Sequence, residues 1–309
     1  MILTFTINPA VDRTVLVDHL VFEDRGYILA RTESAGGRGI NASRVIQSFG
    51  GKTTAILTAG GETGTNMEKM LKDEGFPSDV VHIKGESRTN LTISDKQGLT
   101  VKLNELGPAL EEAELAELKK AVKRRIDQAS WLMICGSIPP GVSTHFYTDL
   151  VQLAREAGVK TLLDTDGDAL LHGIEAHPTV VTPNQQEAER LLNRALLTRS
   201  QFLEAVLRIH AMGAESVLLS LGSRGVIATD GKETVEVIPP RIDALCPIGA
   251  GDALAAAFTW AMEKKKSFSE SVRWGVAAGT ASAAMPGMNF APLDAVKSTF
   301  KKVEVRVAR

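Results

Sequence analysis

The sequence is poor in cysteine, in aromatic residues and in long apolar runs. Only two of its 309 residues are cysteines, and 5% are aromatic. Cys135 and Cys246 stand far apart in a chain that opens without the basic-then-apolar layout of a signal peptide, so we expect reduced thiols and a cytoplasmic protein. No stretch reaches the roughly 18 to 20 apolar residues of a membrane span, and we expect no membrane partner.

The chain also lacks an excess of either charge. It has 35 Lys and Arg against 37 Asp and Glu, a formal net charge of −2, which argues against nucleic acid as a partner. The length fits about two domains, or one large α/β unit with a small appendage. No Walker-type phosphate loop occurs, and neither the histidines nor the cysteines have metal-ligand spacing.

Short apolar segments alternate with helix-length amphipathic segments, a pattern typical of a parallel sheet covered by helices. In the clearest helical segment, 111–129, apolar residues recur three or four positions apart. Strands of the sheet are predicted at 2–6, 54–58, 131–135, 161–163, 180–182, 217–221 and 226–229. Further helices are predicted at 41–49, 66–74, 144–157, 185–193, 200–212, 251–262 and 268–284.

Two segments, about 12–32 and about 88–104, break this rhythm. They contain short alternating stretches at 14–18, 27–31, 90–94 and 100–103, with no helical pattern between them. We expect both segments to form one small β-subdomain inserted into a single domain that spans 1–309.

A glycine-rich turn, Gly249-Ala250-Gly251-Asp252, leads into the predicted helix at 251–262. Free backbone N–H groups and the positive end of the helix dipole form an anion site at such a turn. Asp252 could cap the helix, or it could act as a general base beside a bound phosphate. The motif alone leaves both interpretations open.

A second glycine cluster at 36–42 contains the spacing of a dinucleotide-binding fingerprint, Gly37-x-Gly39-x-x-Ala42. That fingerprint follows a buried strand, whereas the residues before this cluster are polar, so the context argues against a dehydrogenase. A glycine-walled sugar pocket fits better, because the Asn41 side chain can both donate to and accept from hydroxyl groups.

Three further features each have a structural and a functional interpretation. Asn184 and Glu187 could form a helix capping box, or Glu187 could face a magnesium–phosphate assembly through water. The segment 220–225 could be an ordinary hairpin, or its glycines could let the backbone approach a nucleotide. Arg88 and Lys102 could bind a phosphate if they face one cleft, whereas each alone is more typical of a solvated surface.

Taken in order, these motifs resemble those of the PfkB family of carbohydrate kinases, the ribokinase-like group, over almost the whole chain. The opening TINPAVD at 6–12 is similar to the start of its phosphosugar branch. Segments 36–41 and 248–252 are similar to the two family signatures. SRTN at 87–90, LNELGP at 103–108 and GSIPPG at 136–141 are also similar to that branch, and NQQE at 184–187 matches the NxxE motif. Arg38 and Thr182 stand where lysines are usual.

The resemblance implies a ribokinase-like three-layer α/β/α fold with a mostly parallel central sheet, a small β-sheet lid, and ATP with Mg²⁺. It implies that Asp252 is the catalytic base and that the backbone of Gly249, Ala250 and Gly251 stabilises the transferring phosphoryl group. The implied sugar side comprises Asp12, Gly37, Asn41, Arg88, Lys102 and Ser137. The implied nucleotide side comprises Asn184, Ser220, Gly222, Gly225 and Gly251, with Glu187 contacting the metal through water.

The implied reaction is ATP-dependent phosphorylation of a ketohexose phosphate, with fructose 1-phosphate as the first candidate and fructose 1,6-bisphosphate as its product. Tagatose 6-phosphate and fructose 6-phosphate are alternatives, because the same cations could bind a phosphate at the other end of the sugar. A nucleoside kinase would leave Arg88 and Lys102 without a partner, and a non-catalytic sugar-phosphate sensor would not need Asp252. The resemblance also implies a homodimer formed through the lid.

Overall fold

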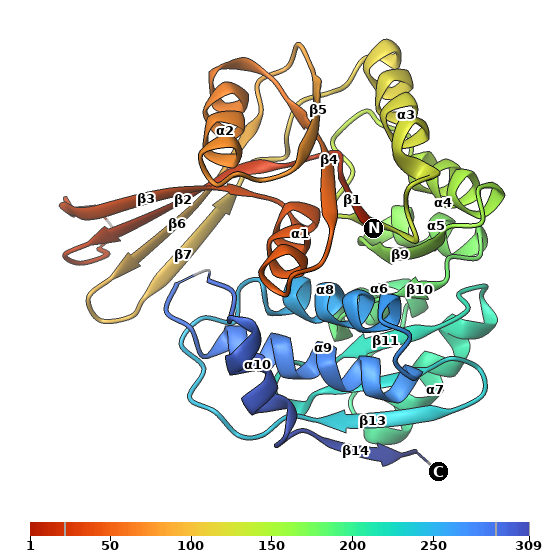
Figure 1. Cartoon of the computed structure of the whole chain (residues 1–309). Coiled ribbons are helices and arrows are strands. Elements are labelled where there is room, and N and C mark those ends of the chain that lie inside the picture. Colours follow the sequence, from red (N-terminus) through yellow and green to blue (C-terminus); the bar gives the residue numbers. More distant parts are fainter. Residues whose placement is uncertain (22, 288, 309) are drawn as a thin grey trace.

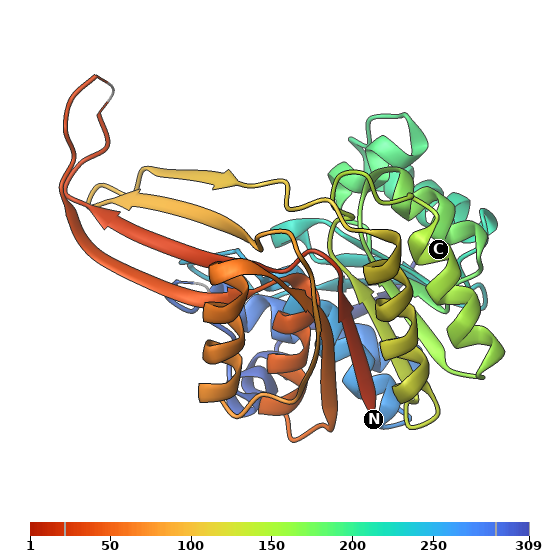
Figure 2. The same ribbon diagram turned by 90° about the horizontal axis from the view of Figure 1, so that it is seen from above.

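The computed structural model describes residues 1–21, 23–287 and 289–308. A ten-stranded sheet in this part of the chain carries helices on both faces, and a four-stranded sheet projects from one side (Figures 1 and 2). The expected fold class, a mostly parallel α/β/α sandwich with a separate small sheet, is confirmed. No helix in the described ranges is long and apolar enough to cross a membrane.

The first strand of the chain, β1 (Ile2–Thr6), lies in the interior of the large sheet, between β8 (Trp131–Cys135) and β4 (Thr53–Ala59). The strands of this sheet, in spatial order, are β14 (Glu304–Val307), β13 (Thr234–Ile238), β12 (Val226–Thr229), β11 (Val217–Ser220), β10 (Val180–Val181), β9 (Lys160–Asp164), β8, β1, β4 and β5 (Ser78–His82). Strands β11 to β5 run parallel, and β12 to β14 are antiparallel. The order reverses between β1 and β8, and ligands of such sheets bind at the strand carboxyl ends near this switch point.

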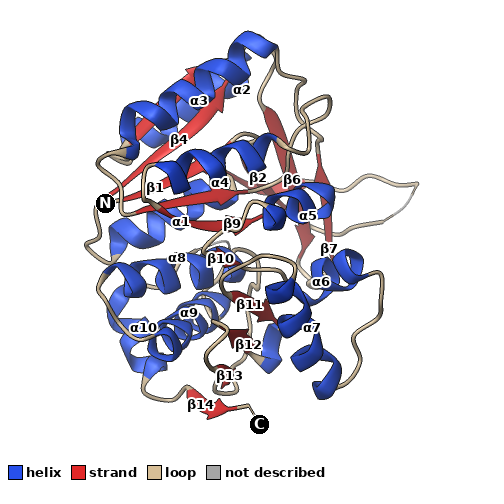
Figure 3. Ribbon diagram, turned by 90° about the vertical axis from the view of Figure 1, so that its right-hand side faces the viewer, coloured by secondary structure: helices blue, strands red, loops and turns tan. Residues whose placement is uncertain are grey.

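Alternating side chains of the strands enter two hydrophobic cores, one on each face. Figure 3 shows the helices that cover the two faces of the large sheet. Leu3 and Phe5 of β1 belong to one core, and Ile2 belongs to the other. The first face is covered by α3 (Glu112–Ile126), α4 (Phe146–Glu156), α5 (Gly167–Glu175), α6 (Gln185–Leu192) and α7 (Arg199–Ala211). The second is covered by α1 (Arg38–Ser48), α2 (Gly61–Asp73), α8 (Ala250–Glu263), α9 (Phe268–Ala283) and α10 (Leu293–Phe300).

The small sheet comes from two separated chain segments. Its order is β3 (Ile28–Gly36), β2 (Ala10–Val17), β6 (Arg88–Asp95) and β7 (Thr100–Asn104). The first pair begins earlier and ends later than the predicted segment 12–32, because β2 and β3 stay paired from Ala10 opposite Gly36 onward. Strand β3 therefore leads directly into α1, at the second glycine cluster.

Two helices begin three or more residues earlier than the sequence pattern predicts. Helix α1 begins at Arg38, three residues early, and α2 begins at Gly61, five residues early. The start of α2 is stabilised from a distance, since the Glu86 carboxylate accepts a 2.6 Å hydrogen bond from the Thr63 N–H group. Five short elements are not predicted from the sequence: helices α5 and α10 and strands β5, β13 and β14. Short elements take their stability from their neighbours in the fold, so the local pattern does not reveal them.

Candidate active site

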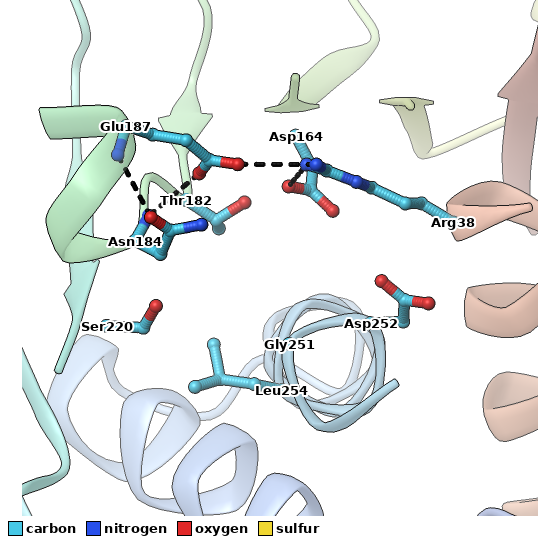
Figure 4. Close-up of a pocket in the computed structure, with 9 residues that line it drawn as sticks. All are labelled: Arg38, Asp164, Thr182, Asn184, Glu187, Ser220, Gly251, Asp252 and Leu254. Carbon is cyan, nitrogen blue, oxygen red and sulfur yellow. Dashed lines mark hydrogen bonds and ion pairs between the residues drawn. The ribbon is translucent and has the colours of Figure 1, made fainter. Parts of the chain in front are cut away.

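A cleft of about 190 Å³ opens at the carboxyl ends of the central strands (Figure 4). It is lined by Arg38, Asp164, Thr182, Asn184, Glu187, Ser220, Gly251, Asp252 and Leu254. These residues come from the ends of β9 and β11, from the turn after β10, and from the first turns of α1, α6 and α8. The fold thus brings together motifs from both halves of the chain.

Asp252 lies in the first turn of α8 and is hydrogen-bonded to a side chain of α1. Asn41 of α1 donates its Nδ2 to Asp252 Oδ2 at 2.7 Å. Burial and the nearby charge of Asp164 raise the pKa of Asp252 to about 7, against the effect of the bond from Asn41. The residue that caps α8 is Gly249, so the structure does not give Asp252 the capping role. A carboxylate with such a pKa is suited to general base catalysis.

The backbone at the start of α8 is open toward the cleft. Gly249 has a φ of 79°, which a residue with a side chain adopts only with strain. The Ala250 N–H group bonds to the Pro247 carbonyl at 3.3 Å, whereas those of Gly251 and Asp252 have no partner in the described part of the chain. A Cβ atom placed on Gly251 would meet open space. The turn therefore has two free donors for an anion.

Arg38 joins three acidic side chains of the cleft. Its Nη1 donates to Asp164 Oδ1 at 2.9 Å, and its Nη2 donates to Glu187 Oε1 at 3.3 Å and to Asp166 Oδ2 at 3.4 Å. Asp164 in particular raises the pKa of Arg38 further above its ordinary value. Arg38 preserves the positive charge of the usual lysine, and it also spans more acceptors than a lysine could.

Sequence reasoning missed Asp164 and Asp166. A usable signal was present, because Asp164 directly follows the apolar residues of a predicted strand, as Ser220 does in its own strand. Carboxyl ends of parallel strands meet at one edge of the sheet, so polar residues there are candidates for a common site.

Asn184 and Glu187 form the capping box. Asn184 Oδ1 accepts from the Glu187 N–H group, and Glu187 Oε2 accepts from the Asn184 N–H group, both at 2.9 Å. Burial raises the pKa of Glu187, and Arg38 opposes this shift. Because the other oxygen of Glu187 faces Arg38, both carboxylate oxygens are already engaged.

The polar lining fits a nucleotide with its metal ion, provided the phosphates and water supply most metal ligands. Among the described residues, no group of three or more His, Cys, Asp or Glu side chains could hold a metal ion. Mg²⁺ commonly keeps several waters and binds through phosphates. Thr182 lines the cleft, and its buried hydroxyl has no partner in the described part of the chain. It is therefore a free group that a bound ligand could satisfy.

The 220–225 segment is a hairpin turn that contributes one residue to the cleft. Strands β11 and β12 are antiparallel, and Ser220 lies beside Asn184 through a parallel bridge. Gly222 and Gly225 have φ values of 60° and 95° and are not among the lining residues. At Gly225 a Cβ atom would lie 2.0 Å from the Val237 carbonyl oxygen, so the hairpin itself requires glycine there.

Arg88, Asp12 and Asn90 share one face of the small sheet. The β2–β6 register pairs Ala10 with Arg88 and Asp12 with Asn90, and Asn90 Nδ2 donates to Asp12 Oδ1 at 2.8 Å. Burial raises the pKa of Asp12, against that hydrogen bond and the charge of Arg88. Burial lowers the pKa of Arg88, and Asp12 opposes this shift. This face carries both hydrogen-bonding groups and a cation.

Arg88 is also tied to the chain around it. Its Nε donates to the Asn8 carbonyl at 3.2 Å, and its Nη1 donates to the Glu105 carbonyl at 2.9 Å. Asn8 Nδ2 in turn donates to the Leu106 carbonyl at 2.9 Å and to Ser137 Oγ at 3.4 Å. Part of the guanidinium therefore braces the loop after β7, and its Nη2 keeps its donors for a ligand.

Two further predicted sugar-side residues are Lys102, an exposed residue of β7, and Gly37, the residue before α1. Lys102 is exposed and pairs with Thr92, four residues along β6 from Arg88. At about 3.3 Å per residue this is roughly 13 Å along the strand, so the two cations share a face without meeting. Gly37 caps α1 with a φ of 133° and stands four residues before Asn41, in the first turns of that helix.

Residues 8–295 match the pfkB family of carbohydrate kinases. ATP-dependent 6-phosphofructokinase isozyme 2 of Escherichia coli is 34% identical over 283 residues, 91% of each chain. Tagatose-6-phosphate kinase of Staphylococcus epidermidis is 30% identical over 308 residues, 99% of each chain. 1-Phosphofructokinase of Borreliella burgdorferi is 30% identical over 284 residues, 92% of each chain.

The fold agrees with these relationships. The crystal structure of phosphofructokinase-2 from E. coli in complex with potassium superposes with a TM-score of 0.92 at 32% identity, covering 97% of this chain and 98% of that chain. The tetrameric inhibited form of the same enzyme gives 0.89 at 31% identity, with the same coverage. The resemblance drawn from the motifs is confirmed: the chain belongs to the pfkB family of carbohydrate kinases, phosphotransferases that act on a sugar hydroxyl.

Proposed function

We propose that the chain transfers the γ-phosphoryl group of ATP to a hydroxyl of a phosphorylated ketohexose, with fructose 1-phosphate as the first candidate. The observation that carries the phosphosugar proposal is Arg88, a partly buried cation on the face that also holds Asp12 and Asn90. A sugar without a phosphate would offer no anion to the Nη2 donors of this cation. Tagatose 6-phosphate and fructose 6-phosphate are the second candidates, since two relatives carry those activities in their names.

In the proposed reaction Asp252 removes the proton of the attacking hydroxyl. The new O–P bond forms as the bond from the γ-phosphorus to the leaving oxygen of ADP breaks, and the proton remains on the Asp252 carboxyl. The free N–H groups of Gly251 and Asp252 support stabilisation of the charge on the transferring group. Mg²⁺, when bound with ATP, neutralises phosphate charge, and Glu187 would contact it through water.

Asn41 and the polar face of the small sheet have the sugar-binding role in this proposal. Asn41 is buried and fixes the orientation of Asp252. Asp12 and Asn90 offer an acceptor and a donor for hydroxyl groups. Ser137 is linked to Arg88 through Asn8, which donates to Ser137 Oγ and accepts from Arg88 Nε. Thr182, Asn184 and Ser220 support the nucleotide side, at the far end of the cleft from Asp252 in Figure 4.

A coupled ADP-release assay tests the proposal directly. The chain is offered ATP with a panel of fructose 1-phosphate, fructose 6-phosphate, tagatose 6-phosphate, free fructose and a nucleoside, with Mg²⁺, with Mn²⁺ and with EDTA. We expect turnover of a ketohexose phosphate, lost in EDTA and recovered with either metal. Turnover of free fructose or the nucleoside at equal kcat/KM would contradict the phosphosugar proposal.

The pH profile should report the raised pKa of Asp252. Only the carboxylate can accept the proton, so kcat/KM should fall about tenfold per pH unit below an apparent pKa near 7 and be level above it. A sugar phosphate titrates near pH 6, so kcat at saturating substrate is measured as well. A profile that stays level down to about pH 5 would place the pKa of the base near the ordinary value of about 4.

We also propose that the chain acts as a homodimer in the cytoplasm, joined through the small sheet. This sheet and its turns carry a set of exposed apolar side chains: Leu16, Tyr27, Ile28, Leu29, Leu99, Val101 and Leu103. Exposed apolar area of this kind favours a protein contact. Both cysteines are free thiols, which suits a reducing compartment.

Charged residues at these exposed apolar positions should dissociate the dimer. Ile28→Asp with Leu103→Asp is expected to give a monomer in light scattering after gel filtration, because each carboxylate would be buried at the contact. Leu207→Asp, at a 51% exposed position of α7, serves as the control and should leave the mass unchanged. A monomeric wild type would contradict the assembly.

A further inference from the structure

Arg38 is a partly exposed cation that pairs with two buried carboxylates and with a third, more exposed one. Its side chain is 31% exposed, whereas those of Asp164 and Glu187 are 10% and 5% exposed. The three residues come from α1, β9 and α6, and Figure 4 shows the guanidinium pointing toward both carboxylates. Asp166, just before α5, completes the cluster at 3.4 Å. Arg38 therefore ties the first helix of the chain to elements more than a hundred residues away.

Carboxylates outnumber cations around this cleft. Asp164, Asp166, Glu187 and Asp252 lie close to Arg38, and Arg38 is the only cation among the described residues that line the cleft. Several carboxylates at one place either take up protons or attract a cation, and a divalent cation is the usual partner of clustered oxygen ligands. In this cluster the guanidinium occupies the oxygens that such an ion would need.

We propose that Arg38 is a positioning residue that serves as a built-in counter-cation. It holds Asp164 and Glu187 and so prevents a free divalent cation from binding them, with the consequence that metal enters the cleft only together with a nucleotide. The inference rests on the proposed function for placing the nucleotide and its metal at this cleft. Displacing the guanidinium by a free ion would leave Arg38, a largely buried cation, without its carboxylate partners, which is costly.

The inference predicts a gain of metal binding when the charge of Arg38 is removed. Arg38→Gln keeps a hydrogen-bonding amide but leaves the carboxylates without a counter-ion. We expect its dissociation constant for Mn²⁺ to fall at least about tenfold below that of the wild type, without any nucleotide present. Arg38→Lys keeps the charge and is expected to stay within about threefold of the wild type.

The experiment is a Mn²⁺ titration of the nucleotide-free, EDTA-dialysed full chain, with free Mn²⁺ read by electron paramagnetic resonance. The wild type, Arg38→Lys, Arg38→Gln and the double variant Arg38→Gln with Asp164→Asn are compared. The double variant should lose the gain, because Asp164 would be one of the ligands. No gain in Arg38→Gln, an equal gain in Arg38→Lys, or a gain that survives Asp164→Asn would each overturn the inference.

Folding is monitored by circular dichroism in the same samples. If Arg38→Gln folds only when Mn²⁺ is added, the dependence supports the inference, and if it stays unfolded with Mn²⁺ the inference is overturned. Because the titration contains no substrate, it is independent of the kinase assay. Failure of the Mn²⁺ prediction with intact turnover overturns this inference alone, whereas absence of turnover with every sugar phosphate overturns the proposed function.

Discussion

Replacing Asp252 by asparagine should lower kcat by about 10² to 10⁴, the range typical of losing a general base. The carboxylate is hydrogen-bonded by Asn41 and has its pKa raised to about 7 by burial and by Asp164. Asparagine has nearly the same shape but cannot accept the proton of the sugar hydroxyl. Because burial disfavours the carboxylate, the amide should not lower the thermal unfolding midpoint. Steady-state kinetics and a melting curve on the same preparation measure both effects.

Asp294→Asn is the matched control for this prediction. Asp294 is in the first turn of α10, with a side chain that is 93% exposed and paired to Lys297. A surface pair of this kind contributes little, so the control should keep the wild-type kcat. If Asp252→Asn retained more than about half of the wild-type kcat, where removal of a base ordinarily costs at least a hundredfold, another group would have to be the base.

Replacing Arg88 by alanine should raise KM for the sugar phosphate by roughly ten- to a hundredfold while the KM for ATP changes little. Losing a charge-assisted hydrogen bond costs about 1.5 to 3 kcal/mol, and about 1.4 kcal/mol corresponds to a factor of ten. The preference for the phosphosugar over free fructose should narrow as well. Varying each substrate in turn separates the two KM values.

The bracing role of Arg88 calls for two companion variants. Arg88 also donates to the carbonyls of Asn8 and Glu105, so part of any loss could come from the loop it holds. Arg88→Lys keeps the charge without the forked geometry and should lose less affinity than alanine if the phosphate contact dominates. Lys102→Ala should change KM by less than about threefold, since its exposed side chain gains little from one ionic contact. If Arg88→Ala raised the KM for ATP and not the KM for the sugar phosphate, the assignment of the small sheet to sugar binding would be wrong.

The order of motifs along the chain was enough to predict the fold class, the family and most residues of the cleft. Alternating apolar strands and amphipathic helices are local patterns, and those at 2–6, 131–135 and 226–229 became β1, β8 and β12 with the predicted bounds. Helix α2, which begins at a glycine, starts five residues before its predicted start. Its first turn is stabilised by the distant Glu86, and no local pattern reveals such a partner.

The site shows the same division between what is local and what is not. The glycine turn before Asp252 and the capping box of Asn184 with Glu187 are visible in a few consecutive residues. Whether Asp252 caps its helix or faces a cleft was decided only in the folded chain, where Gly249 caps α8, Asp252 lines the cleft and Asn41 of α1 contacts its carboxylate. The sequence alone does not show how far apart Arg88 and Lys102 lie. The strand register places Lys102 opposite Thr92, four residues along β6 from Arg88.

The sequence by itself determined the family, the parallel sheet and the chemical types in the site, because these depend on periodicity and on short motifs. Only the tertiary structure decided which charges meet. Arg38 lies against Asp164, Asp166 and Glu187 because the sheet reverses its strand order between β1 and β8, which brings α1 to the ends of β9 and β10. The raised pKa of Asp252 has the same origin, since burial and the field of Asp164 exist only in the folded chain.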